Sequence, residues 1–238
     1  MANYHLSVIM PVYNDEPFLN EAIESILSQT YNDFEFIIIN DGSTDNSLKI
    51  IKSYSDQRIL ILQHDKNKGI SKALNYGLRY AKGRFIARMD ANDIALSERF
   101  DKQIKYLIKE KEIGLVTCLH ENINTEAKPI QTLNRDISPS NSQVCTFFRN
   151  YIPHSSVMID GDIITDIKYN EDCAAEDFEL WIQLSEKTEF YMIPDVLMKI
   201  RIDKKGLSQR NKQNCELAQK RIIKQKLEQL GIDTNDKE

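Results

Sequence analysis

Short apolar runs alternate with amphipathic segments through the first half of this 238-residue chain. The runs have the length of buried strands, and the segments between them repeat apolar residues at the spacing of a helix face. Alternating strands and helices predict an α/β fold with one Rossmann-like, mostly parallel sheet and right-handed crossovers. The expected strands are Leu6–Met10, Phe34–Ile39, Ile59–Leu62, Phe85–Met89 and Ile113–Leu119, and the expected helices are Phe18–Gln29, Leu48–Tyr54, Ile70–Ala81 and Glu98–Glu110.

Polar loops follow three of these strands. The sequences PVYND, NDGSTD and DAND begin at Pro11, Asn40 and Asp90. Ligands of an open parallel sheet bind beyond the carboxyl ends of its strands, so we expect the three loops to converge on one crevice. No Gly-x-Gly-x-x-Gly turn or P-loop follows the first strand, which argues against a dinucleotide site or a P-loop site.

The second half of the chain is less regular. We expect a helix in 138–150, a short strand His154–Asp160 and a helix Ala174–Lys187, whose acidic start is favoured by the helix dipole. Two strands, EFYMI and DVLMKIRI, follow. The chain is then expected to form an amphipathic helix with Ile223, Leu227 and Leu230 on one face.

Composition and length fit one domain with a sizeable core, or one domain with an appendage. Hydrophobic residues make up 41% of the chain and charged residues 28%, as in ordinary globular proteins. We find neither a secretory signal nor an apolar run near the roughly 20 residues that span a bilayer. The four cysteines are widely spaced without a CxxC pair, which predicts reduced thiols in a cytoplasmic protein.

Charge is distributed unevenly along the chain. The segment Lys199–Lys226 carries ten basic and two acidic residues, so the remainder has a net charge of −13, against −5 for the whole chain. Such a basic segment is typical of contact with phosphate groups or an anionic membrane surface. A solvated helix face is an equally good interpretation. We expect no nucleic-acid partner.

Several motifs in a fixed order resemble one known family. The stretch VIMPVYNDEPFLNEAIESILSQTYNDFEFIIINDGSTDNS resembles the opening of glycosyltransferase family two, the inverting enzymes with a GT-A fold, and NKGISKALNYGLRYAKGRFIARMDAND resembles its continuation. HSSVMI, AEDFELWIQL and IPDVLMKIRIDKKGLSQ resemble the acceptor half of bacterial polysaccharide and O-antigen transferases. We therefore expect a GT-A domain at 1–210, with a nucleotide-sugar half at 1–118 and an acceptor half at 119–210. Residues 211–238 would add a helix and tail.

The resemblance implies the reaction and its partners. A sugar would pass from a nucleotide diphosphate sugar, usually a UDP-sugar, to an acceptor hydroxyl with inversion at the anomeric carbon. The acceptor would be a glycan or a lipid-diphosphate-linked saccharide. A divalent cation, Mn²⁺ or Mg²⁺, would neutralise the leaving diphosphate. Many relatives act at the inner membrane face, where the C-terminal helix could make a peripheral contact; packing on its own domain or in a homodimer fits the helix equally.

An inverting transfer needs one general base and no covalent nucleophile. Asp177 matches the Asp of the family's Glu-Asp motif and is our candidate base, and Glu176 is the candidate for orienting the acceptor or a loop. Trp181, one turn later, can form a wall of the site. Acidic residues that only favour the helix dipole are the alternative for this pair. His154 is a candidate for lining the acceptor site, or a structural histidine.

The nucleotide-binding candidates follow from the family match. Asp41 matches the carboxylate that accepts a hydrogen bond from uracil, and Asn40 stands where a second Asp is common. Tyr13 can stack on uracil or serve as a core aromatic residue. Lys72 matches a position near the base and phosphates, or is a solvated lysine. The other candidates are Pro11, Val12, Asp15, Asn67, Gly69, Asp90, Ala91 and Arg201, with Lys204, Lys205 and Arg210 joining Arg201 as a diphosphate clamp or forming a basic linker.

The expected metal site departs from the family pattern at two positions. Asp90 fills the first, ribose-binding place of the family's Asp-x-Asp, but Asn92 stands in the second, metal-binding place, with Asp93 next to it. Many relatives have a metal-binding His where this chain has Asp203. We hypothesise that the two changes compensate and give an all-oxygen shell of Asn92 and Asp203. Asp203 as a loop acid is the alternative for that residue.

Two rival functions remain at this point. A nucleotidyltransferase would share the nucleotide half, but it would lack the Glu-Asp helix motif. A degenerate member of the fold would bind a UDP-sugar or a partner without turnover, which Asn40, Asn92 and the missing His favour.

Overall fold

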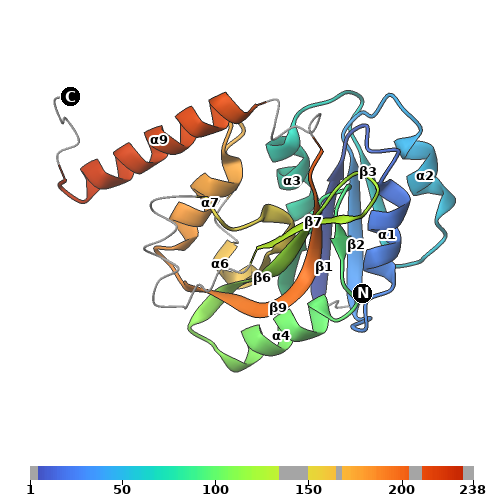
Figure 1. Ribbon diagram of the computed structural model, residues 1–238, viewed down its shortest axis with the longest axis horizontal. Coiled ribbons are helices and arrows are strands. Elements are labelled where there is room, and N and C mark those ends of the chain that lie inside the picture. The colour runs from blue at the N-terminus through green and yellow to red at the C-terminus, as the bar shows by residue number, and fades with distance from the viewer. Residues whose placement is uncertain (1–4, 134–149, 165–167, 204–210, 233–238) are drawn as a thin grey trace.

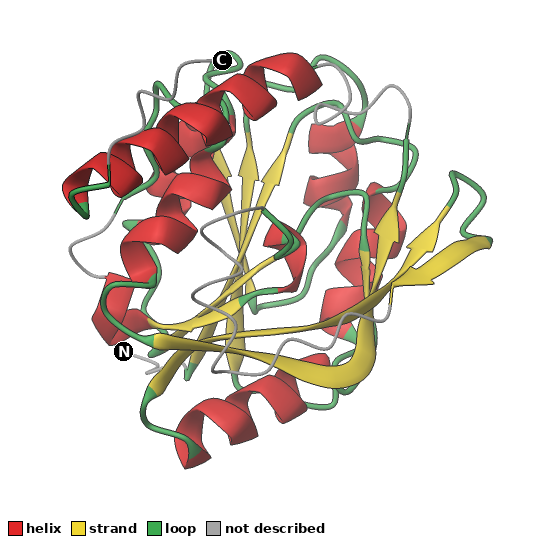
Figure 2. Ribbon diagram, turned by 60° about the vertical axis from the view of Figure 1, so that its left-hand side comes forward, coloured by secondary structure: helices red, strands yellow, loops and turns green. Residues whose placement is uncertain are grey.

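A computed structural model of the chain describes residues 5–133, 150–164, 168–203 and 211–232. These residues form a mixed sheet with helices on both faces (Figures 1 and 2), and nine strands can be described in the order β3-β2-β1-β4-β8-β6-β9-β5, with β7 paired to β6. The strands are β1 Leu6–Val12, β2 Phe34–Asn40, β3 Ile59–Gln63, β4 Phe85–Arg88, β5 Ile94–Ala95, β6 Ile113–Ile123, β7 Pro129–Leu133, β8 Met158–Asp160 and β9 Glu189–Arg201. The helices are α1 Leu19–Leu27, α2 Ser47–Ser53, α3 Ile70–Leu78, α4 Arg99–Lys109, η1 His154–Ser156, α6 Gly161–Ile164, α7 Glu176–Leu184 and α9 Lys212–Gln229.

The first half of the chain folds as its apolar pattern predicts. β3, β2, β1 and β4 are parallel neighbours. Alternate residues of β1 pack on opposite faces: Val8 belongs to the cluster that contains α1 and α4 residues, whereas Ile9 belongs to the cluster with α3 and α7 residues. Burial on both faces explains why β2 carries the continuous apolar run Phe36–Ile39.

Strand β4 lies at the junction between the two halves of the sheet. It pairs parallel to β1 on one side and antiparallel to β8 on the other. Beyond β8, β6 is antiparallel to β8 but parallel to β9, and β5 returns antiparallel to β9. The expected parallel order therefore holds for the first half, and the second half is mixed.

Two strand predictions need correction. EFYMI and DVLMKIRI form one strand, β9, which curves strongly (Figure 2). Its register against β6 jumps from Cys118↔Ile193 to Leu119↔Val196 around Pro194, since proline has no N–H to donate to a ladder. The expected strand from His154 begins only at Met158, because His154–Ser156 form a turn of 3₁₀ helix. The expected helix in 138–149 lies outside the described residues.

Helix α9 packs on α7 through a face that matches the expected one only at Ile223, which is partly buried there. Ala218 and Ile222 are buried against a cluster that includes Phe178 and Ile182, whereas Leu230 is 59% exposed. The far end of α9 extends away from the sheet (Figure 1). None of the helices in the described ranges is long and apolar enough to cross a membrane.

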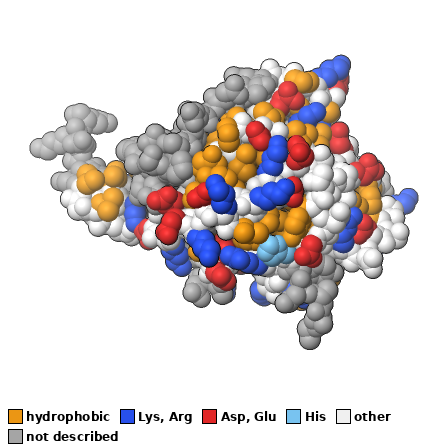
Figure 3. Space-filling view, turned by 90° about the horizontal axis from the view of Figure 1, so that it is seen from below, with side chains coloured by type: hydrophobic (Ala, Val, Ile, Leu, Met, Phe, Trp, Pro, Cys, Tyr) orange, Lys and Arg blue, Asp and Glu red, His pale blue; other side chains and the backbone are white. Residues whose placement is uncertain are grey.

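The surface mixes charges of both signs. On the face in Figure 3, acidic and basic side chains lie next to one another around hydrophobic side chains. Cys118, Cys173 and Cys215 are free thiols, as predicted, and Cys145 lies outside the described ranges.

Candidate active site

The loops after β1 and β2 lie against each other, as expected for carboxyl ends of neighbouring parallel strands. Asn14 adopts a positive φ of 57°, and its side-chain oxygen accepts a hydrogen bond from the Thr44 N–H at 2.8 Å. The N–H groups of Asn14 and Asp15 donate to the Ser43 and Ser47 hydroxyls at 3.2 and 3.1 Å. The two loops therefore form one wall of the candidate site.

Asp41 connects this wall to the loop before α3. Its buried carboxylate lies 2.6 Å from His64 Nδ1 and accepts hydrogen bonds from the N–H groups of Lys68 at 3.0 Å and Gly69 at 2.9 Å. The following Gly42 has φ +69°, and a Cβ there would lie 2.3 Å from the Lys66 carbonyl carbon. Only glycine fits, so the loop before α3 lies directly on the turn after Asp41. Direct contact of Asp41 with uracil stays a prediction.

The other nucleotide candidates differ in accessibility. Tyr13 is 45% exposed, so the alternative of a core aromatic residue is wrong and its ring is accessible for stacking. Val12 and Ala91 have buried side chains, and Val12 contributes its carbonyl oxygen, which accepts the Asp41 N–H at 2.8 Å. The remaining surface candidates are partly or fully exposed: Pro11, Asn67, Gly69 and Lys72.

A buried arginine lies among the acidic side chains of the site. Arg88, the last residue of β4, has a 4% exposed side chain and forms an ion pair with Asp90, which is 37% exposed. Burial raises the pKa of Asp15 to about 6; the charge of Asp90 raises it further, and that of Arg88 lowers it. The ends of β1 and β4 lie together because the two strands pair in parallel, with Ile9 opposite Arg88. Arg88 was not a sequence candidate, because the burial of an arginine that ends an apolar strand cannot be seen in the sequence pattern.

The acid pair at the start of α7 faces the same site. Burial raises the pKa of Glu176 to about 7, the Asp177 charge adds to the shift, and Arg88 opposes it. Burial also raises the pKa of Asp177, which the Asn150 amide lowers by donating to Oδ2 at 2.8 Å. A buried carboxylate whose pKa lies above the usual range is suited to taking up a proton near neutral pH.

His154, Tyr169 and Trp181 form an aromatic cluster on the helix that carries the acid pair. The His154 Nε2 lies 2.8 Å from the Tyr169 hydroxyl, and the His154 ring meets Trp181 edge to face at 5.5 Å. Burial lowers the pKa of His154 well below its usual value, so this histidine is neutral near pH 7. Neither Tyr169 nor Asn150 was a sequence candidate, because neither belongs to a recognisable motif.

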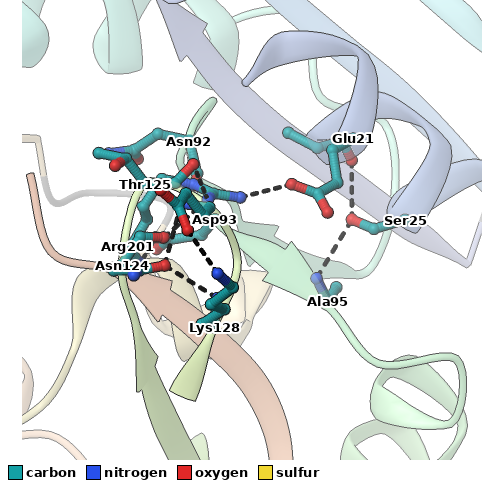
Figure 4. Close-up of polar contacts among 11 residues, drawn as sticks. Glu21, Ser25, Asn92, Asp93, Ala95, Asn124, Thr125, Lys128 and Arg201 are labelled. Atoms are coloured by element: carbon teal, nitrogen blue, oxygen red, sulfur yellow. Dashed lines mark hydrogen bonds and ion pairs between the residues drawn. The ribbon is translucent and has the colours of Figure 1, made fainter. Parts of the chain in front are cut away.

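Arg201 ties together four segments (Figure 4). Its Nε donates to the Asn92 backbone oxygen at 2.9 Å, its Nη1 donates to the Asn124 and Thr125 carbonyls at 2.9 and 3.1 Å, and its Nη2 pairs with Glu21 of α1. Its side chain is 1% exposed. These contacts favour a structural role over the diphosphate clamp expected for Arg201. Lys204, Lys205 and Arg210 lie outside the described ranges.

The expected metal ligands differ in burial: Asp93 is buried, whereas Asn92 and Asp203 are partly exposed. Asp93 is 2% exposed, and its oxygens accept the Arg201 N–H at 2.8 Å and the Ser155 hydroxyl at 2.5 Å. Burial raises its pKa to about 7, which the Asp90 charge reinforces. Those contacts favour a structural role for Asp93. Asn92 and Asp203 are partly exposed, and the contact between Asn92 and Arg201 brings the DAND loop to the chain just before Asp203.

The residues present fit a hard cation only with ligands from a substrate. In the described part of the chain, no group of three or more His, Cys, Asp or Glu side chains is arranged to hold a metal ion. One amide oxygen and one carboxylate are suitable oxygen donors for Mg²⁺ or Mn²⁺, which commonly take further ligands from substrate phosphates.

The comparison with known proteins decides the family. A sequence model described as glycosyl transferase family 2 matches residues 7–161. This chain belongs to glycosyl transferase family 2. The match covers the loops after β1, β2 and β4, whereas the acid pair of α7 and Arg201 lie beyond it. Membership identifies the chain as a glycosyltransferase and sets aside the nucleotidyltransferase alternative.

Individual family members support this assignment. The chain is 35% identical over 210 residues to the uncharacterized glycosyltransferase MJ1057 of Methanocaldococcus jannaschii, covering 83% of this chain and 70% of that protein. It is 30% identical over 185 residues to the Escherichia coli UDP-Glc:alpha-D-GlcNAc-diphosphoundecaprenol beta-1,3-glucosyltransferase WfgD, covering 77% and 71%. The fold matches S. aureus TarS 1–349 in complex with UDP with a TM-score of 0.72 at 19% identity, covering 97% of this chain and 67% of the TarS chain. The expected GT-A fold is confirmed.

Proposed function

We propose that this glycosyltransferase moves a sugar from a UDP-sugar to an acceptor hydroxyl with inversion at the anomeric carbon, in the assembly of a bacterial surface polysaccharide. The acceptor is a glycan or a lipid-diphosphate-linked saccharide. The observation that carries the proposal is the buried acid pair Glu176–Asp177 at the start of α7, which interacts electrostatically with Arg88 and Asp90 at the end of β4.

Asp177 acts as the general base. Its carboxylate takes the proton of the acceptor hydroxyl, and the acceptor oxygen forms a bond to the anomeric carbon as the bond from that carbon to the diphosphate oxygen breaks. The electron pair of the broken bond leaves with UDP. Burial, which raises the pKa of Asp177, makes its carboxylate a stronger proton acceptor than an exposed aspartate. The amide of Asn150 fixes the carboxylate orientation.

The donor lies along the loops after β1, β2 and β4. Tyr13 offers an exposed ring to stack on the base. Asp41 holds the loop before α3 in place through two backbone N–H groups. Asp90, which Arg88 anchors, is available to the ribose.

A divalent cation would neutralise the charge that develops on the leaving diphosphate. Asn92 and Asp203 would hold it, together with diphosphate oxygens. Asp93 would then support the loop rather than the cation, because both of its oxygens have protein donors.

Two relatives support the substrate classes. WfgD is named for transfer from UDP-Glc to a diphosphoundecaprenol-linked sugar, and TarS 1–349 was solved with UDP. We infer a uridine donor and a lipid-linked acceptor for this chain from those names together with the basic charge of the segment from Lys199 to Lys226, which suits a cytoplasmic enzyme working at an anionic membrane surface.

The test is a UDP-release assay with a panel of UDP-sugars, run with Mn²⁺, with Mg²⁺ and with a chelator. We expect cation-dependent UDP release from one donor, faster when the acceptor is present. Binding of UDP-sugars without release would favour the degenerate member described above. If no nucleotide sugar binds in isothermal titration calorimetry, the proposed function is wrong.

A further inference from the structure

His64 and Asp41 form a buried pair at the carboxyl ends of two neighbouring strands, and the sugar transfer described so far gives the histidine no role. Asp41 follows β2 and His64 follows β3, and the two strands are parallel. The His64 Nδ1 lies 2.6 Å from Oδ1 of Asp41, and the two side chains are 8% and 4% exposed. An ionised carboxylate only accepts hydrogen bonds, so Nδ1 of His64 carries a proton and donates to Asp41.

Contacts with two other elements fix the His64 ring. The backbone N–H of His64 donates to the Asn40 carbonyl at 3.0 Å, which holds the residue at the end of β2. The ring stacks on Tyr76 of α3, with the ring centroids 4.9 Å apart and the planes 21° from parallel. A ring held by its backbone and by a stacking partner presents Nδ1 in a fixed direction. It therefore fixes the orientation of the Asp41 carboxylate.

The hydrogen bonds to Asp41 do not use the full capacity of its carboxylate. Among the described residues, three groups donate to it: the His64 ring, the Lys68 N–H and the Gly69 N–H. The Lys68 N–H is shared between Oδ1 at 3.0 Å and Oδ2 at 3.2 Å. A carboxylate can accept about four hydrogen bonds. Roughly one acceptor position is therefore left for a ligand.

Asp41 also borders the wall along which the donor is proposed to lie. Its N–H donates to the Val12 carbonyl at 2.8 Å, and the next residue, Tyr13, has the exposed ring proposed to stack on the base. In a uridine nucleotide the ring N3 carries a proton, whereas N3 of cytosine does not and only the 4-amino group of cytosine can donate. A carboxylate that could turn would accept from either base. A carboxylate in a fixed orientation pairs with one base and is left unpaired by the other, which gives strong discrimination.

We propose that His64 is a positioning residue that sets the base specificity of the donor site: its Nδ1–H fixes the Asp41 carboxylate so that the remaining acceptor position takes N3–H of uracil and not the 4-amino group of cytosine. This inference rests on the proposed function. The same hydrogen bond keeps the carboxylate on the two backbone N–H groups of the loop before α3, so the base and this loop are positioned by one side chain.

The test compares the binding of UDP and CDP to the purified chain by isothermal titration calorimetry with Mn²⁺ present. His64→Phe keeps a ring to stack on Tyr76 but removes the Nδ1–H. Its preference for UDP over CDP falls about tenfold or more, the effect expected when a hydrogen bond to a charged group is lost. His64→Asn places an amide N–H two bonds from Cβ, as in Nδ1 of histidine, and restores the preference. A merely structural role would weaken the binding of both nucleotides equally and leave the ratio of their affinities unchanged.

His5→Leu is the matched control. The His5 Nδ1 lies 2.8 Å from the Tyr31 hydroxyl just before β1, at the amino end of that strand, so its loss leaves both affinities unchanged. If thermal unfolding shows that His64→Phe does not fold, His64→Leu replaces it.

A UDP preference that survives the loss of Nδ1–H overturns the inference, as does a His64→Asn chain that loses the preference to the same extent as His64→Phe. A wild-type chain that binds UDP and CDP equally overturns this inference and leaves the proposed transfer standing. A wild-type chain that binds neither UDP nor a UDP-sugar overturns the proposed function, and this inference with it.

Discussion

Arg201 and Asn92, 109 positions apart in the chain, meet where Nε of the arginine donates to the backbone oxygen of the asparagine at 2.9 Å. The Arg201 N–H also donates to the neighbouring Asp93. Two contacts thus hold the DAND loop against the end of β9, and the chain that leaves β9 continues to Asp203. The side chains that carry the two departures from the family pattern are brought to one region by this arrangement.

Loss of the Arg201 side chain should destabilise the fold. Arg201→Met leaves the carbonyls of Asn92, Asn124 and Thr125 without their donor and Glu21 without its partner. We expect the free energy of unfolding to fall by about 3 kcal/mol, as for other broken buried ion pairs, measured by urea denaturation. Lys128→Met, which removes a 73% exposed lysine paired with Glu126, should change stability little. Equal effects of the two substitutions would contradict the structural role of Arg201.

Asp203 should control the response to the cation. In Asp203→Ala we expect the Mn²⁺ concentration for half-maximal UDP release to rise by about tenfold or more. Loss of a residue that only supports a metal ligand typically lowers metal affinity roughly 10–100-fold, and loss of the ligand itself should lower it at least as much. Asp195→Ala is the control, since Asp195 lies on β9, shortly before Asp203, but pairs with Lys102 at 2.9 Å on the surface. An unchanged Mn²⁺ dependence in the Asp203 variant would rule out the paired role of Asn92 and Asp203.

Asp177→Asn should abolish most turnover while the donor still binds. General base catalysis contributes roughly 10²–10⁴-fold, and kcat should fall by that amount in an assay of UDP release with acceptor present. UDP affinity in calorimetry should stay near the wild-type value because the loops after β1 and β2 are untouched. Asp172→Asn removes an exposed carboxylate just before α7 and should retain full activity. A fully active Asp177 variant would exclude it as the base.

Asn150→Ala should weaken the base without removing it. Its amide lowers the pKa of Asp177 by donating to Oδ2 at 2.8 Å, so its loss should move the acid limb of the kcat profile to higher pH, with kcat falling about tenfold on the acid side for each unit of that shift. Asn170→Ala, which removes an exposed amide that donates to Glu179 at 3.2 Å, should leave the profile unchanged. A kcat profile of Asn150→Ala that overlays the wild type would show that the amide does not tune the base.

Glu176 should make the free chain less stable at higher pH. Its folded-state pKa of about 7 lies above the ordinary value of 4.5, so the folded state binds this proton more tightly than the unfolded state does. Proton binding by Glu176 therefore stabilises the folded state by up to about 3 kcal/mol. This stabilisation is fully present below pH 4.5 and is lost as the pH rises through 7. Urea unfolding without nucleotide or cation, compared at pH 5 and pH 8, should show a smaller loss for Glu176→Gln. An identical pH dependence in both proteins would contradict the raised pKa.

The pattern of apolar residues predicted the first half of the fold because each strand and helix there is regular and buried. The same pattern failed in the second half, where contacts with other elements override the local sequence signal. Pro194 suggested the end of a strand, but β9 passes through it because β6 pairs on both sides of the bulge. In α9, the spacing of Ile223, Leu227 and Leu230 suggested a buried face, but of these only Ile223 packs against the α7 cluster, whose buried α9 residues are Ala218 and Ile222.

Site residues could be predicted only where they belong to a recognisable sequence motif. The acid pair of α7 stood out through its neighbouring carboxylates, and the loops through their polar sequences after apolar strands. Arg88 and His64 did not stand out, because their importance depends on burial and on partners from other elements. Arg201 was expected to meet phosphate because of its basic neighbours, whereas its actual partners are carbonyl oxygens and Glu21.

The pairing of β5 has a consequence for the order in which the protein can form. β4 pairs with β1, both from the first 88 residues, but β5 pairs with β9, at Ile94↔Lys199 and Ala95↔Met198. The DAND loop connects β4 to β5. Because β5 is held in the sheet by β9, the strand that anchors this end of the loop is synthesised about a hundred residues after the loop itself. A nascent chain can assemble the parallel strands early, yet the DAND loop acquires its final geometry only when β9 has been inserted.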